Sequence, residues 1–126
     1  AETLRHYIPE RHRQFLDSLP DAIRFGDYVL VHAGIRPGVA LEDQNPTDMR
    51  WIRQEFLTSK GDHGAFIVHG HSISTEPDLQ ANRMGIDTGA YRSGTLTALG
   101  LEGERRWLIQ ASVIDGEVQT KLSSFG

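Results

Sequence analysis

Two short apolar runs constrain the fold of this chain most, because each ends at a histidine that a glycine-containing turn follows at once. The runs and their turns are Tyr28–Val31 before His32-Ala33-Gly34, and Ala65–Val68 before His69-Gly70-His71. An uninterrupted apolar run is typical of a strand that is buried on both faces. A neutral imidazole at the carboxyl edge of such a strand is a rigid nitrogen ligand for a metal. The sequence therefore predicts two buried strands whose ends carry candidate metal ligands.

Helical spacing of apolar residues occurs in two segments before and between these runs. The first segment predicts a helix over residues 9–19. In the second, Asn45 is predicted to cap a helix that starts at the next residue. The inward face of this second helix is predicted to consist of Met49, Ile52 and Phe56. The order of helix, strand, helix and strand favours a mixed α/β structure.

After Gly85 the pattern changes to short β-rich segments that are joined by turns. These segments and turns are residues 95–101, Glu102-Gly103, Arg106–Ile109, Ser112–Ile114, Asp115-Gly116 and Val118–Leu122. Asp-Gly between two apolar runs is a strong hairpin signal. The whole pattern therefore predicts an α/β fold with a mixed sheet and a C-terminal antiparallel meander. A sheet built only from these pieces leaves strand edges bare, so we also expect self-association through exposed sheet edges as one way to cover them.

Size and composition narrow the classes of function. The chain has 126 residues, of which 38% are hydrophobic and 24% charged, so it fits one domain or part of a larger one. It has no cysteine, which leaves His, Asp, Glu and Asn as metal ligands. A formal net charge of −4 argues against broad nucleic-acid binding. No apolar run has the length of a bilayer span, so we expect no membrane partner and a cytoplasmic location.

Histidines supply the candidate metal ligands. His32 follows four apolar residues, and it is either a ligand or a histidine that is hydrogen-bonded to backbone. Alternation in an extended segment would put His69 and His71 on one face, so both could bind one metal, or one could be a structural neighbour of the other. The remaining histidines lie in polar surroundings and are predicted to be solvated: His6, His12 and His63.

Arg53 is the candidate phosphate ligand, because a guanidinium beside a metal site can hold phosphate oxygens with two donors. The alternative is a helix-face arginine that is solvated or paired with Asp48 or Glu55. Arg36 is a weaker candidate for the same role. Asp87 could ligate a metal, but as an aspartate near a glycine it is better suited to accept backbone N–H bonds in a turn.

Four short motifs occur in an order that resembles the calcineurin-like metallophosphoesterases. They are Val31-His32-Ala33-Gly34, Trp51-Ile52-Arg53, Gly70-His71-Ser72 and Ile86-Asp87-Thr88-Gly89-Ala90. The similarity runs from Gly26 to Leu101, and it is to the bacterial and phage branch of the serine/threonine protein phosphatases. The fold of that family is an αββα sandwich. The resemblance therefore implies that residues 1–126 form the C-terminal part of a single metallophosphoesterase domain.

The resemblance also implies a metal centre. Members of the family hold two divalent metal ions, usually manganese or iron, which share a carboxylate and a water, and the bridging hydroxide attacks phosphorus. By resemblance, His32 and His71 both ligate the second metal, and Arg53 holds a substrate phosphate. His69 falls at a position where the family tolerates other residues, and the family suggests no ligand role for Asp87.

Three motifs of the family do not occur in this chain: Gly-Asp-x-His, Gly-Asp-x-x-Asp, and Gly-Asn-His followed by an acidic residue. In the family they supply the ligands of the first metal, the bridging carboxylate and the histidine that protonates the leaving group. We therefore expect the chain to be the C-terminal half of a phosphoesterase domain whose N-terminal half is absent through truncation or proteolysis. This half would carry no catalytic residue and at most a partial metal site, so we expect it to have little or no activity alone.

The parent protein is expected to be a hydrolase with serine/threonine phosphatase-like activity on phosphomonoesters. Its substrate would be a phosphorylated protein or a small phosphoester. Hydrolysis of diadenosine polyphosphates, in which the same metals cut a phosphoanhydride, is the alternative within the enzyme class. The alternative from another class is a non-catalytic binding or self-association module, in which His32 and His71 are structural. The sequence leaves these alternatives open.

Overall fold

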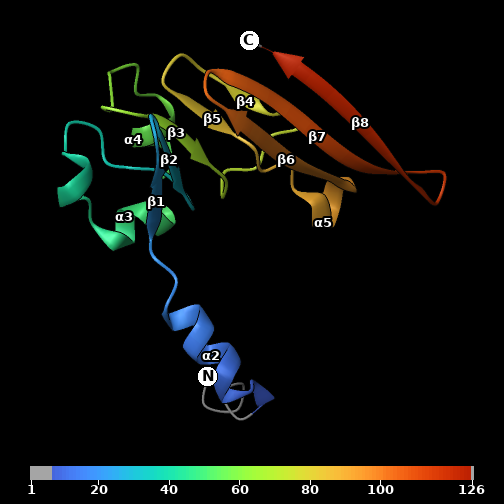
Figure 1. The fold of residues 1–126 in the computed structure, drawn as a ribbon, viewed down its shortest axis with the longest axis horizontal. Helices are drawn as coiled ribbons and strands as arrows, with labels where there is room; N and C mark the ends of the chain where they lie inside the picture. Colours follow the sequence, from blue (N-terminus) through green and yellow to red (C-terminus); the bar gives the residue numbers. More distant parts are fainter. Residues whose placement is uncertain (1–6, 126) are drawn as a thin grey trace.

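A five-stranded mixed sheet and a three-stranded antiparallel sheet form the frame of the protein (Figure 1). The computed structural model describes residues 7–125. The strand order is β1-β2-β3-β5-β4 in the first sheet and β6-β7-β8 in the second. The strands are β1 (Ala22–Phe25), β2 (Tyr28–Val31), β3 (Phe66–His69), β4 (Asp78–Leu79), β5 (Arg83–Gly85), β6 (Thr95–Glu102), β7 (Arg105–Ile114) and β8 (Glu117–Phe125). The predicted α/β class, with a mixed sheet and a C-terminal antiparallel meander, is confirmed.

The two predicted apolar strands, β2 and β3, lie side by side in the first sheet and run parallel. β3 begins and ends one residue later than predicted. β5 pairs with β3 in parallel, whereas the edge strands β1 and β4 run antiparallel to their neighbours. The sequence pattern does not reveal β1, β4 or β5, because strands of four, two and three residues are too short to show a periodicity.

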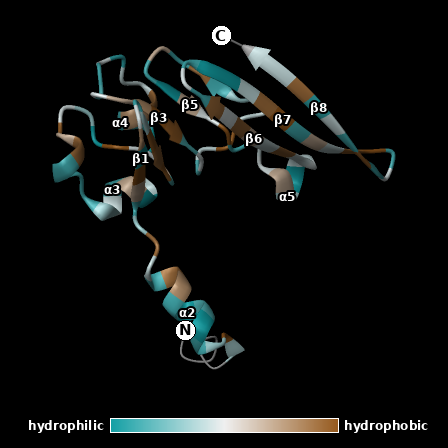
Figure 2. Ribbon diagram, viewed as in Figure 1, coloured by the Kyte–Doolittle hydropathy of each residue, from teal (hydrophilic) through white to brown (hydrophobic). Residues whose placement is uncertain are grey.

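The main core lies between one face of this sheet and the chain that follows β2. Phe56 is fully buried there and packs with Val29, Val31, Ile35 and Ile67. β3 is mostly hydrophobic (Figure 2), and its sequence is apolar up to the terminal His69. Burying a side chain of this size contributes about 1.5–3 kcal/mol, so this cluster anchors the sheet.

The predicted second helix is wrong in one respect, because it is broken into two. α3 covers Pro46–Trp51 and α4 covers Gln54–Leu57, and a 3-10 turn, η1, precedes them at Leu41–Asp43. The predicted cap is confirmed: the Asn45 side chain accepts the backbone N–H of Thr47 at 2.8 Å. Ile52 is extended, with a ψ of 145°, and Arg53 has φ −133° and ψ −102°, outside the helical region.

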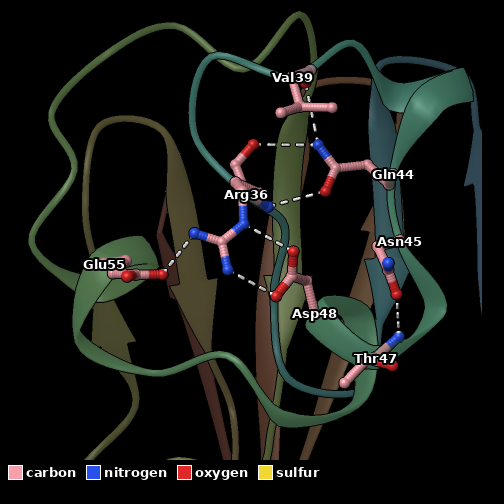
Figure 3. A network of polar contacts seen from close by, with 7 residues as sticks. All are labelled: Arg36, Val39, Gln44, Asn45, Thr47, Asp48 and Glu55. Carbon is pink, nitrogen blue, oxygen red and sulfur yellow. Dashed lines mark hydrogen bonds and ion pairs between the residues drawn. The ribbon is translucent and has the colours of Figure 1, made fainter.

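Ion pairs and hydrogen bonds hold this break in place (Figure 3). Arg36 donates two hydrogen bonds to Asp48 of α3, at 2.6 and 2.7 Å, and one to Glu55 of α4, at 2.7 Å. Gln44 is buried, and its side-chain amide bonds the backbone N–H and C=O of Arg36 as well as the C=O of Val39. One arginine thus bridges the two helices, and the break turns Arg53 away from both carboxylates.

The first predicted helix is confirmed as α2 (Glu10–Asp17), which projects away from the sheets (Figure 1). Its apolar side chains Phe15 and Leu16 are 63% and 56% exposed, so the helical stripe that identified it covers no core. His12 is exposed, as predicted, whereas His6 lies outside the described residues. No helix among residues 7–125 is long and apolar enough to cross a bilayer.

The meander has longer strands than the sequence pattern indicated, with turns where they were predicted. Asp115 and Gly116 have φ values of 52° and 82°, which is typical of a type I′ hairpin turn. The meander joins the first sheet through polar groups. Arg106 donates to the Tyr28 hydroxyl at 3.0 Å, and the hydroxyls of Thr88 and Thr97 are hydrogen-bonded at 2.9 Å.

Candidate metal and phosphate site

The structure brings together the two histidines that follow the predicted strands. Because β2 and β3 are parallel neighbours, with Val31 opposite His69, their carboxyl ends meet at one edge of the sheet. The Gly70 N–H donates to the His32 carbonyl at 2.9 Å and ties the two chain segments together just beyond the strands. The ring centroids of His32 and His71 lie 5.0 Å apart.

His71 has a buried ring nitrogen that is free of protein hydrogen bonds within residues 7–125. Its Nε2 atom is buried and has no hydrogen-bond partner among the described residues. Burial lowers the pKa of His71, and the charges of Arg53 and His32 lower it further, so the imidazole is neutral at pH 7. Two nitrogens that share one ion lie about 3 Å apart, at metal–nitrogen distances of about 2.1 Å. The 5.0 Å separation of the rings is compatible with such a shared ion.

The prediction that His69 and His71 share one face is wrong. The extended backbone ends at His69, and His71 adopts a left-handed conformation with a φ of 65°, so the alternation stops between them. The His69 ring turns into the core instead, where only 2% of the residue is exposed. Its Nε2 atom lies 3.1 Å from Nη1 of Arg83. His69 therefore lies beside the site and does not face His32.

Arg53 carries the guanidinium that lies nearest this pair. Its Nη1 atom lies 3.4 Å from both the His71 carbonyl and the Ser72 hydroxyl, and the residue is exposed. The expected alternative, an ion pair with Asp48 or Glu55, does not form, because Arg36 binds both carboxylates (Figure 3). The hydrogen bonds and the charge of Asp48, together with the charge of Glu55, raise the pKa of Arg36. In turn, the hydrogen bonds and the charge of Arg36 lower the pKa of Asp48. Of the two candidate phosphate arginines, the weaker one is therefore occupied.

A cavity of about 390 Å³ adjoins the two histidines and separates them from the meander. Its walls are apolar, with Leu30 and Val68 from the first sheet and Leu99 and Leu101 from β6. Asp87 also lines it, and its Oδ1 atom accepts the N–H of Gly89 at 3.0 Å. The predicted turn role of Asp87 is confirmed by this bond.

The sequence did not predict the burial of two residues in this region, His63 and Arg83. His63 is half-buried and not solvated, and its ring centroid lies 5.6 Å from that of Phe56. Burial lowers its pKa. Arg83 is only 3% exposed and organises the region behind His69. A lone arginine in a three-residue strand gives no sequence signal, because only its burial distinguishes it from a solvated one.

The donor set fits part of a metal site. Two imidazole side chains suit divalent first-row metals. Within residues 7–125, no group of three or more histidine, aspartate or glutamate side chains is gathered closely enough to hold an ion. Neither a protein-family model nor a curated protein sequence matches this chain.

Proposed function

We propose that this chain forms the second-metal and phosphate-binding half of a calcineurin-like metallophosphoesterase, with an αββα fold, whose carboxylate ligands lie outside the chain. The observation that carries the proposal is the buried, unpartnered Nε2 atom of His71, in a ring 5.0 Å from that of His32. A buried polar atom without a partner costs about 1–3 kcal/mol, and coordination of a metal removes that cost. A purely structural histidine would be expected to have a hydrogen-bond partner there.

In this proposal the three site residues of the chain have separate roles. His32 and His71 hold one divalent ion, manganese or iron, between the ends of β2 and β3. Two such ions, when bound, supply a hydroxide nucleophile and neutralise the charge of the phosphate. Arg53 orients the substrate by donating N–H bonds to phosphate oxygens, for which it is available because Arg36 binds the nearby carboxylates. The cavity beside the histidines has mostly apolar walls, so it offers few groups that compete for the phosphate.

The proposed reaction of the parent protein is the hydrolysis of phosphomonoesters, with a phosphorylated protein or a small phosphoester as substrate and the cytoplasm as its location. This half supplies one metal, without a bridging carboxylate. For that reason the isolated chain should hydrolyse p-nitrophenyl phosphate slowly or not at all with manganese present. Robust metal-dependent turnover by the isolated chain would contradict the division of the site into halves.

Metal binding is the first test. We expect cobalt(II), used as a spectroscopic probe for manganese or iron, to bind the chain weakly at one site. His32→Ala and His71→Ala should each abolish saturable binding, because a single imidazole does not hold the ion. His12→Ala, which removes an exposed histidine of α2, is the matched control and should leave binding unchanged. Binding that survives His32→Ala, or no saturable binding at all, would overturn the proposal.

Phosphate binding to the cobalt-loaded chain is the second test. Hydrogen bonds to charged groups contribute about 1.5–3 kcal/mol, so Arg53→Met should weaken inorganic phosphate binding about tenfold to a hundredfold. Arg50→Met is the control, because Arg50 is three residues away and pairs with Asp21 at 2.5 Å. Equal losses in both variants would indicate a diffuse electrostatic effect and exclude the specific role of Arg53.

A binding or self-association module is a second candidate, and the outer face of the meander favours it. Large apolar side chains are 41–70% exposed on that face: Leu96, Ile109, Val113, Val118 and Leu122. Sedimentation of the chain would distinguish the two candidates. A dimer that Leu122→Glu dissociates, together with unchanged behaviour of His32→Ala and His71→Ala in metal, would favour the module.

A further inference from the structure

A buried polar network lies behind the candidate site, on the core side of the first sheet. Its centre is Arg83, whose side chain is 4% exposed. The Nη1 atom of Arg83 lies 2.7 Å from a carboxylate oxygen of Asp78 and 3.1 Å from Nε2 of His69. The Nη2 atom donates to the Leu57 carbonyl at the end of α4, at 3.0 Å. One guanidinium thus joins β3, β4, β5 and α4.

This network fixes the tautomer of His69. A guanidinium has donors only, so Nε2 of His69 must accept the bond from Arg83 and cannot carry a proton in the neutral ring. The proton of the neutral imidazole then resides on Nδ1. That atom lies 3.1 Å from the Gly70 carbonyl oxygen, to which it donates. The arginine therefore determines which hydrogen bond the other side of the ring makes.

Packing holds the His69 ring in this orientation. Its centroid lies 5.0 Å from that of Phe56, edge to face at 80°. The Cε1 and Nε2 atoms of the ring lie close to Gly85, where a Cβ atom would be 3.2 Å from Cε1 and 3.3 Å from Nε2. An aromatic side chain and a bare stretch of backbone therefore both pack against the ring, and its two nitrogens keep their partners.

The hydrogen bond to the Gly70 carbonyl bears on the backbone of the next residue. That oxygen lies in the peptide plane between Gly70 and His71. Rotation of this plane about the N–Cα bond of His71 changes the φ angle of His71. The φ angle is 65°, a left-handed value that costs a residue with a side chain about 1–2 kcal/mol. The same carbonyl also accepts the N–H of Ser72 at 2.7 Å. A strained conformation of this kind persists only where its surroundings enforce it.

We propose that Arg83 and His69 are positioning residues, which hold the Gly70 peptide plane so that His71 stays left-handed and keeps its Nε2 atom beside His32. The consequence for metal affinity rests on the proposed function. The tautomer of His69 and the backbone of His71 do not rest on it. The two ideas can therefore fail separately.

The decisive measurement is the tautomer of His69 by long-range proton–nitrogen NMR correlation on the wild-type chain without metal. We expect the proton on Nδ1 in the wild type. In Arg83→Met the donor to Nε2 is lost, so the proton should redistribute between the two nitrogens, and the HN–Hα coupling of His71 should change. A wild-type ring that is protonated on Nε2 would overturn the proposal, as would a tautomer and a coupling that are unaffected by Arg83→Met.

Metal affinity gives the functional readout. Outer-shell partners typically change affinity about 10–100-fold, so His69→Leu, which keeps a side chain of similar volume, should weaken cobalt(II) binding by at least about tenfold. His69→Asn is smaller than histidine but keeps an amide donor near the Nδ1 position, so it should recover part of the loss. Ile67→Ala is the packing control, because it empties a fully buried site on the same face of β3 without touching Gly70.

The three variants separate the interpretations. Weak binding in His69→Leu with near-normal binding in Ile67→Ala supports a positioning role. Equal losses of affinity in both variants would mean that His69 acts only through core packing, and would overturn the positioning role. A wild-type chain that binds no metal would overturn the proposed function, and the tautomer and coupling of the wild type would then still decide the role of Arg83 and His69.

Discussion

The two sheets of this protein are stabilised in different ways. The first sheet has strands of two to four residues, yet the largest fully buried side chains lie in it or pack on it: Phe56, Ile35, Ile67 and Met84. The meander has strands of eight to ten residues, and among residues 95–124, whose exposure is described, only Thr97 and Leu108 are buried. Strand length and hydrogen-bond pairing therefore say little about where the core lies. The candidate site is attached to the shorter, better packed sheet, and the meander contributes one wall of its cavity.

The largest expected effect comes from the packed side of this comparison. Phe56→Ala removes the side chain on which the first sheet, α4 and the His69 ring converge. We expect a loss of about 3–5 kcal/mol in the free energy of unfolding. Leu122→Ala, on the exposed face of the meander, should cost less than about 0.5 kcal/mol. Urea unfolding of both variants measures the difference, and comparable losses would mean that the two sheets share one core.

The same substitution, glycine to alanine, can be made beside each of the two sheets to compare how tightly they are packed. A Cβ atom at Gly34 would overlap the fully buried Phe56 ring, and one at Gly100 would overlap the indole of Trp107, its cross-strand partner. Overpacking typically costs about 1–3 kcal/mol, and we expect Gly34→Ala at the upper end because Phe56 cannot move. Gly100→Ala should cost less, because the half-buried indole can swing outward and shift its fluorescence. A larger loss at Gly100 would show that the meander is the tighter region.

The same contrast explains what could be predicted from the sequence. The apolar runs identified β2 and β3, because buried strands must be apolar, and the positions of His32 and His71 followed from them. The break after α3 could not be predicted, since Met49, Ile52 and Phe56 keep helical spacing across it. It depends on an arginine that is distant in sequence, Arg36.

The site was accessible to sequence reasoning only in part. Motif order identified His32, His71 and Arg53 as candidates, and the structure adds that Arg36, not Arg53, pairs with Asp48 and Glu55. The network of Arg83 and His69 was invisible, because burial is a property of the folded chain. The left-handed turn at His71 was missed for the same reason, since a histidine there gives no turn signal of the kind that glycine gives.

Acidification should act on one region only, because all six histidines precede β6. Burial lowers the pKa of His63, which faces Asp62 and Arg83, below the unfolded value of about 6.5. Protons therefore bind the unfolded chain more tightly, so stability is full above that pH and is lost as the pH falls below it. The Tm should fall between pH 7.5 and 5.5. His63→Gln should flatten this decline and His12→Gln should not, and equal slopes in all three proteins would exclude His63 as a contributor.

The smallest expected effects come from one ion pair in each region. Asp48 accepts two bonds from Arg36 and anchors the break that frees Arg53, whereas the pair between Glu102 and Arg105 spans an exposed turn of the meander. Exposed pairs contribute about 0–1 kcal/mol, so Glu102→Gln should leave the unfolding free energy almost unchanged. Asp48→Asn should cost more, since it leaves the guanidinium between α3 and α4 with Glu55 alone. If Glu102→Gln is as costly as Asp48→Asn in urea at low salt, the network around Arg36 is an ordinary surface ion pair, and the break at Ile52 must be held by packing alone.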